Sequence, residues 1–89
     1  MFRLWGKLWK DNHMIRDFVV EDDREATRTA KVLDALTALA NEFDLSVPIW
    51  LDANIREFQR ISRTRFRQDS FIETIPFDYL EIQVIEEDY

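Results

Sequence analysis

The chain has 89 residues, of which 46% are hydrophobic and 34% are charged, and its formal net charge is −6. This length supports one hydrophobic core rather than two, so we expect residues 1–89 to form a single domain. The absence of cysteine excludes disulfides and thiolate metal sites and favours a cytoplasmic location, while the acidic balance disfavours general affinity for nucleic acid.

Residues 2–10 fit two periodicities. As a strand, the segment places Phe2, Leu4, Gly6 and Leu8 on one face and Arg3, Trp5, Lys7 and Trp9 on the other. As a helix, it gathers its apolar residues on one side and resembles a short basic anchor at a membrane surface. We favour the strand, because Asp11 and Asn12 are typical turn residues and residues 14–20 are typical of a second strand. The first twenty residues therefore predict a hairpin.

A long amphipathic helix is predicted over about residues 24–43. Asp22 or Asp23 can cap its first turn, and Glu25 stands three residues after Asp22, in the spacing of a capping box. The apolar positions that recur at helical spacing are Val32, Leu33, Leu36, Leu39, Ala40 and Phe43. We expect these residues to face the core.

Pro48 interrupts the helical pattern, so residues 45–51 are predicted to be extended, with Ile49 and Trp50 in the core. Asp52 is a natural N-cap for a second, short helix. On this helix Ile55, Phe58 and Ile61 are predicted to face the core, and Arg56, Arg60 and Arg63 to share the opposite face.

The last third of the chain contains a loop and a strand. Residues 64–73 have no clean period and predict a surface loop held down by Phe66, Phe71 and Ile72. Residues 76–86 alternate as a strand, with Leu80, Ile82 and Val84 on one face. We therefore expect an α+β fold in which a small antiparallel sheet, formed by the hairpin and the C-terminal strand, packs on the two helices.

Residues that carry catalysis are scarce. Gly6 is the only glycine, which excludes the glycine-rich loops that cradle nucleotide phosphates. His13 is the only histidine and stands at the predicted turn, where an exposed structural role is the simpler interpretation. No carboxylates have the spacing of metal ligands. We therefore expect no enzyme activity, cofactor, metal site or membrane span.

Charge is segregated along the chain, and this produces a first candidate site. Residues 32–55 and 68–89 contain no basic side chain, whereas residues 56–67 contain five arginines and one glutamate. The arginines are Arg56, Arg60, Arg63, Arg65 and Arg67. Guanidinium groups recognise phosphate and carboxylate, so the cluster suggests binding of RNA or single-stranded DNA. The alternative is that these arginines pair with the chain's own acids.

The far face of the predicted sheet is a second candidate site. Trp5 and Trp9 on the first strand are expected to join Phe77 and Tyr79 on the last, among charged neighbours. Aromatic residues mixed with cations are typical of interface cores, so this face predicts binding of another protein or formation of a homo-oligomer such as a homodimer. The alternative is that a loop or the second helix covers it.

Several short runs also suggest a family resemblance. They are FRLWGK (2–7), WLD (50–52), EFQR (57–60), TRF (64–66), DSFIE (69–73) and FDYLEI (77–82). With these runs the chain resembles a group of short, uncharacterised bacterial proteins of unknown function. The resemblance implies a cytoplasmic bacterial protein and transfers no activity or site residue. The preferred hypothesis from the sequence is thus a non-catalytic interaction module, with nucleic-acid binding as the alternative.

Overall fold

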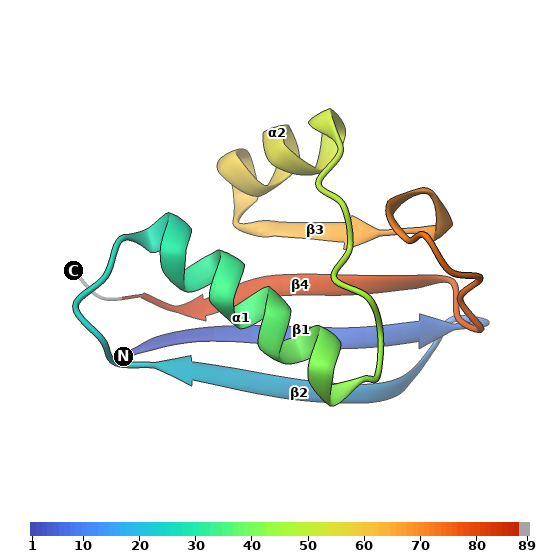
Figure 1. Cartoon of the computed structure of the whole chain (residues 1–89), viewed down its shortest axis with the longest axis horizontal. Coiled ribbons are helices and arrows are strands. Elements are labelled where there is room, and N and C mark those ends of the chain that lie inside the picture. Colours follow the sequence, from blue (N-terminus) through green and yellow to red (C-terminus); the bar gives the residue numbers. More distant parts are fainter. Residues whose placement is uncertain (88–89) are drawn as a thin grey trace.

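The computed structural model describes residues 1–87 and has an α+β architecture. Its elements are β1 (Phe2–Lys10), β2 (His13–Asp22), α1 (Arg28–Glu42), α2 (Asp52–Ile61), β3 (Arg63–Phe66), the 3-10 turn η1 (Gln68–Ser70) and β4 (Tyr79–Glu86). The four strands form one antiparallel sheet in the order β2-β1-β4-β3 (Figure 1). The predicted fold class is confirmed, and the sheet gains a strand that the sequence analysis missed.

The N-terminal hairpin is confirmed. Lys10 pairs with His13, and the two residues between them, Asp11 and Asn12, have φ angles of 51° and 64°. A two-residue hairpin turn of this kind needs positive φ at both positions, which Asp and Asn tolerate better than most residues. Residues 2–10 are therefore a strand, and the alternative of an amphipathic helix for this segment is wrong.

The core lies between α1 and one face of the sheet. Phe2, Leu4 and Leu8 of β1 point into it and are buried, as their alternation predicts. Gly6 occupies the same face at the point where α1 comes closest: a Cβ built on it would lie 2.6 Å from Cδ2 of Leu39. The single glycine of the chain is therefore a close-approach residue between strand and helix.

The start of α1 corrects the sequence analysis. The helix begins at Arg28 rather than near residue 24, and Thr27 is its N-cap, with its hydroxyl accepting a hydrogen bond from the Ala30 N–H at 3.1 Å. Asp22 instead binds Arg24 through that residue's side chain and its backbone N–H. These hydrogen bonds lower the pKa of Asp22 to about 2. The predicted cap is thus a local Asp–Arg turn outside the helix.

The second helix ends early, because Ser62 adopts a left-handed conformation with φ of 54° and turns the chain directly into β3. Arg63 therefore belongs to the strand and does not share a helix face with Arg56 and Arg60. At the other end, Leu51 is the N-cap residue, and Asp52 is already the first residue of the helix.

Several residues predicted for the core are exposed. They are Leu33 on α1, Ile49 in the connection, Ile55 and Ile61 on α2, and Ile72 in the last loop, which is 83% exposed. Trp50 is partly buried and makes edge-on ring contacts with Phe58 and Phe66, at centroid distances of 5.4 and 5.0 Å. Of the two side chains expected in the core, only Trp50 packs there; Ile49 is held through its backbone N–H, which donates to the Ser70 carbonyl at 2.7 Å.

Residues 64–73, predicted to be a loop, contain β3 and η1. Thr64 and Phe66 are buried while Arg63 and Arg65 are exposed, which is the alternation of a strand with one covered face. Four residues are too few to establish a period on their own. The strand forms because it pairs with β4, whose sequence lies more than ten residues further along the chain.

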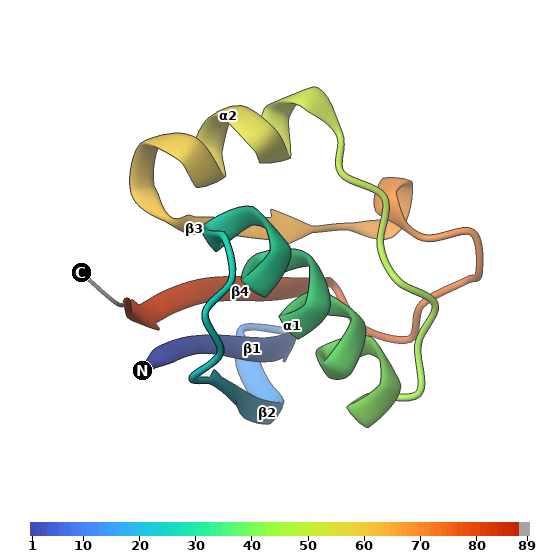
Figure 2. The same ribbon diagram turned by 60° about the vertical axis from the view of Figure 1, so that its left-hand side comes forward.

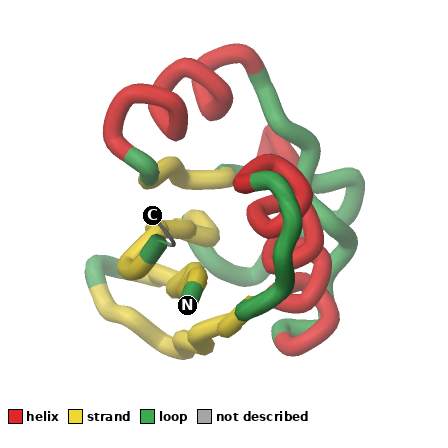
Figure 3. The backbone as a smooth tube through the Cα atoms, turned by 90° about the vertical axis from the view of Figure 1, so that its left-hand side faces the viewer, coloured by secondary structure: helices red, strands yellow, loops and turns green. Residues whose placement is uncertain are grey.

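The two helices leave one face of the sheet open. Figure 1 and Figure 2 show α1 crossing in front of the sheet and α2 lying beyond its β3 edge. Seen along the strands in Figure 3, α1 covers one face of the sheet and α2 lies above its β3 edge. The opposite face carries no helix. We call this opposite surface the open face. Within residues 1–87, no helix is long and apolar enough to cross a membrane.

Candidate functional site

The open face is built by the side chains that alternate away from the core on all four strands. From the ladder pairing they are Arg3, Trp5, Lys7 and Trp9 on β1; Met14, Asp17, Val19 and Glu21 on β2; Arg63 and Arg65 on β3; and Tyr79, Glu81, Gln83 and Glu86 on β4. The two central strands contribute the aromatic residues, and the edge strands contribute most of the exposed charges. The result is an aromatic centre flanked by ions.

Three of the four aromatic residues predicted for an interface lie on this face. Trp9 and Tyr79 are neighbours, with ring centroids 6.4 Å apart, and Trp5 lies two residues further along β1. Phe77 does not join them. It precedes β4, is buried in the core and packs edge-on against Phe71 at 5.9 Å, because the strand starts only at Tyr79. Phe77 is therefore removed from the candidate interface.

Cations lie over the rings of the open face. Nζ of Lys7 is 3.9 Å from the centroid of the Trp5 ring, and the guanidinium carbons of Arg65 and Arg67 are 4.7 and 5.1 Å from the Tyr79 centroid. These distances are within the range of favourable cation–π contacts. The rings and the long cationic side chains thus hold one another in place, so the surface is ordered before any partner binds.

A buried carboxylate organises the middle of the face. Glu81 is only 5% exposed and forms ion pairs with Lys7 at 3.2 Å and with Arg65 at 3.1 Å. Burial alone would raise the pKa of Glu81, but the hydrogen bonds from Arg65 and Lys7 outweigh it and lower the pKa below its usual value. Lys7, 8% exposed, also donates to Gln83. Glu81 therefore remains ionised at neutral pH.

The pairing register places four charged residues in one row across the sheet. Lys7 is opposite Asp17 on one side and Glu81 on the other, and Glu81 is opposite Arg65. In strand order β2-β1-β4-β3 the row reads Asp17, Lys7, Glu81, Arg65, with charges of alternating sign. Asp17 also accepts a hydrogen bond from the indole N–H of Trp5 at 2.9 Å. We call these four residues the charge row.

The arginine cluster is divided between two elements. Arg56 and Arg60 lie on α2, Arg63 and Arg65 on β3, and Arg67 directly after β3. Pairing with the chain's own acids holds for Arg65 alone: within residues 1–87 the other four form no ion pair with a carboxylate. Most of this cationic charge is therefore free to meet an external group.

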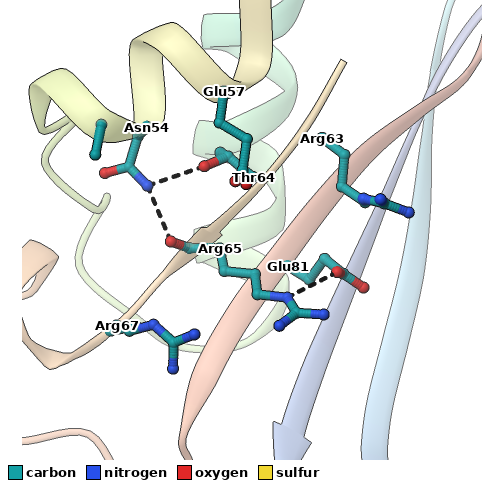
Figure 4. A pocket seen from close by; sticks show the side chains of 8 residues that line it. Asn54, Glu57, Arg63, Thr64, Arg65, Arg67 and Glu81 are labelled. Atoms are coloured by element: carbon teal, nitrogen blue, oxygen red, sulfur yellow. Dashed lines mark hydrogen bonds and ion pairs between the residues drawn. The ribbon is translucent and has the colours of Figure 1, made fainter. Parts of the chain in front are cut away.

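A depression of about 430 Å³ lies where α2 meets β3, beside the open face (Figure 4). Arg63, Arg65 and Arg67 line it together with Glu57 and Glu81. Arg56 and Arg60 are not part of its lining, but both are within one turn of Glu57 on α2. Three of the five arginines predicted as a cluster thus line one region, and Arg56 and Arg60 remain on α2 outside its lining.

Asn54 fixes the geometry of this depression. Its side-chain oxygen accepts from the Leu51 N–H at 3.1 Å, and its amide nitrogen donates to Thr64 Oγ1 at 3.0 Å and to the Arg65 carbonyl at 2.9 Å. The last bond occupies a carbonyl on the outer edge of β3, as Figure 4 shows. Asn54 was not predicted as a site residue. Its only signal in the sequence is its position three residues after Leu51, where its side chain can accept from the N-cap residue of α2.

A second hollow, of about 420 Å³, lies on the helical side between α1 and α2. Its lining includes Leu33, Ile55, Trp50 and Phe58. The sequence analysis placed Leu33 and Ile55 in the core, yet they are 47% and 41% exposed. Apolar residues that fit the helical period but find no partner across the core are the sequence signal of such a groove.

The titratable side chains outside the open face form no further site among the described residues. His13 is exposed at the start of β2, away from the depression, and among residues 1–87 no three His, Asp or Glu side chains gather to hold a metal ion. Comparison with known proteins gives no match to any family model, curated protein or solved structure. The resemblance to short bacterial proteins therefore stays a prediction.

Proposed function

We propose that this chain is a non-catalytic protein-interaction module and that the open face is its binding surface. The observation that carries the proposal is the clustering of Trp5, Trp9 and Tyr79, with cations over two of their rings, on a face that no helix covers. Trp, Tyr and Arg are the residues most enriched at the energetic centres of protein interfaces. The cysteine-free composition supports a cytoplasmic location.

The order within the face supports the same function. The Glu81 ion pairs and the cation–π contacts fix long side chains whose immobilisation would otherwise oppose binding. Ordering a flexible side chain at an interface costs about 0.5–1.5 kcal/mol. A preorganised surface avoids much of that cost, so a partner binds it with a more favourable free energy than it would bind the same side chains if they were flexible.

The experiment compares a variant of the open face with a matched variant of the opposite side. Trp9→Ser removes a partly buried ring from the open face, and Leu33→Ser removes a partly exposed apolar side chain from α1. Each protein is immobilised, exposed to cell extract and to its own free tagged copy, and the retained chains are quantified by mass spectrometry. We expect W9S to lose binding that L33S keeps. Equal retention by folded W9S and the original chain would refute the proposal.

A second candidate function is binding of single-stranded RNA or DNA. It is favoured by the four arginines that lack a carboxylate partner within residues 1–87. Arg63 lies in β3, Arg67 directly after it and Arg60 at the end of α2, and Arg56 lies earlier on α2. The net charge of −6 opposes it over the molecule as a whole. Because Lys7, Arg65 and Arg67 already occupy ring faces of Trp5 and Tyr79, base stacking on those rings would require displacing them.

Fluorescence anisotropy with a labelled single-stranded oligonucleotide tests this second candidate. Arg63→Ser combined with Arg67→Ser should abolish binding and flatten its salt dependence, since each lost phosphate contact reduces the slope. Arg56→Ser combined with Arg60→Ser separates the contribution of α2. An oligonucleotide affinity that is unchanged by the first pair, or absent in the original chain at low salt, would exclude the candidate.

A further inference from the structure

We infer that the partner of the open face is a second copy of this chain, stacked face to face about a twofold axis parallel to the strands. The inference rests on the proposed function and names its partner. Its basis is the charge row Asp17, Lys7, Glu81, Arg65, whose signs alternate across the four strands. A row with this pattern is complementary to itself when it is read in reverse.

A twofold axis along the strands reverses the strand order of the second copy. β2 then faces the partner's β3, and β1 faces the partner's β4. Arg65 meets the partner's Asp17, and both of these residues are exposed. Lys7 and Glu81, 8% and 5% exposed, lie between them already paired with each other within each chain, so the centre of the row carries no exposed charge of its own. Because the contact is isologous, the pair of Arg65 with Asp17 occurs twice.

The charge row also selects this arrangement over the other face-to-face twofold. With the axis in the plane of the sheet but perpendicular to the strands, and crossing the charge row, each strand would face its own copy, so Arg65 would face the partner's Arg65 and Asp17 the partner's Asp17. Like charges brought together in an interface cost several kcal/mol. Only the axis along the strands avoids such contacts in the row.

The neighbouring rows fit the same arrangement. Trp9 pairs with Tyr79 within one sheet, so reversing the order stacks Trp9 on the partner's Tyr79. In the row on the other side, Trp5 lies beside Gln83 and Val19, and Arg63 would cover the partner's Val19. Aromatic rings therefore lie next to the charge row in the centre of the contact, where hot-spot residues concentrate.

The dimensions of the face suit two packed sheets. Three strand spacings separate β2 from β3, a width of about 15 Å, and successive rows are about 7 Å apart. Packed sheets lie about 10 Å apart and cross at about 30°, so the outer pairs are displaced by a few Å. The long Arg65 side chain, 49% exposed, can span such a displacement to the partner's Asp17.

A charge exchange tests the arrangement. Asp17→Arg places arginine opposite arginine at both symmetric contacts, and Arg65→Asp places aspartate opposite aspartate. We expect the original chain to be a dimer by light scattering on a sizing column, and each variant alone to dimerise at least about tenfold more weakly. Mixed together, D17R and R65D should form a heterodimer, because both contacts between them are again of opposite charge. The doubly exchanged chain D17R/R65D should dimerise with itself.

Two outcomes would overturn the inference: a monomeric original chain at all concentrations, or D17R and R65D that dimerise separately as well as they do together. Circular dichroism verifies that each variant is folded, since R65D places a second carboxylate near Glu81. If R65D does not fold, Arg65→Gln replaces it in the mixing test. A monomer whose open face still retains a different protein, lost in W9S, would refute this inference and leave the proposed function intact; loss of both would refute the two together.

Discussion

The only glycine of the chain gives the sharpest test of the fold. Gly6 lies on the core face of β1, and an alanine there would bring its Cβ to 2.6 and 2.7 Å from the two methyl carbons of Leu39 and to 3.1 Å from Cγ. Leu39 is fully buried, so its methyl carbons must shift within the packed core to admit the new Cβ. Overpacking of this kind costs about 1–3 kcal/mol, whereas replacing glycine in a strand recovers about 0.5–1 kcal/mol. We expect Gly6→Ala to lower the free energy of unfolding by up to about 2.5 kcal/mol.

A double-mutant cycle with Leu39→Ala makes this expectation specific. Leu39→Ala alone should cost about 2–5 kcal/mol, because it removes buried methyl groups and leaves a cavity beside β1. In that background the added methyl of Gly6→Ala enters the cavity, and about 0.8 kcal/mol of transfer free energy favours it. The effect of Gly6→Ala should therefore change sign, from destabilising to neutral or stabilising.

Urea unfolding followed by tryptophan fluorescence measures all four proteins, at one fixed chain concentration so that any self-association affects them equally. Trp50 reports on the core through its contacts with Phe58 and Phe66. The same effect of Gly6→Ala in both backgrounds would refute the close approach of α1 to β1.

Further substitutions at four residues test the site and the helix start. Glu81→Gln leaves Lys7 buried without its carboxylate and should cost about 1–3 kcal/mol at pH 7. The lowered pKa of Glu81 means that its stabilisation is present above the ordinary value of 4.5 and is lost as the pH falls below it, so urea midpoints from pH 7 to 3 should fall less steeply in E81Q. Asn54→Ala should cost about 1–3 kcal/mol, because it removes three hydrogen bonds. Asn54→Asp should also be destabilising, because a carboxylate cannot replace the two donated bonds. Urea midpoints equal to that of the original chain would refute the structural role of Asn54. Thr27→Ala should cost about 1 kcal/mol, and Glu25→Ala less than about 0.5 kcal/mol, in thermal unfolding; the reverse order would restore the capping box expected from the sequence.

Local patterns in the sequence predicted most of the fold. Asp11 and Asn12 between two alternating segments predicted the hairpin, since positive φ angles at both positions suit few other residues. The apolar period predicted α1, and Pro48 predicted the break after it. These features depend on neighbours within a few residues, so a single sequence contains them.

Elements that depend on distant partners were misjudged. β3 has four residues and forms because β4 supplies its ladder. The start of α1 was misjudged for a local reason instead: Asp22 is bound by the Arg24 side chain and backbone N–H, so Thr27 is the N-cap although Asp22 has the better sequence signature. Exposure at Leu33 and Ile55 follows from where α2 lies, beyond the β3 edge and apart from α1.

For the candidate site, the sequence by itself determined which residue types are present and which strand face each occupies: alternation placed Trp5 and Trp9 opposite the core, and composition concentrated arginine in residues 56–67. Only the tertiary structure decided which of them meet. The register brought Lys7, Glu81 and Arg65 into one row, because pairing between β1 and β4, which are more than sixty residues apart, and between β3 and β4 depends on the packing of the whole chain and not on any local period. The late start of β4 at Tyr79 left Phe77 outside the strand and in the core.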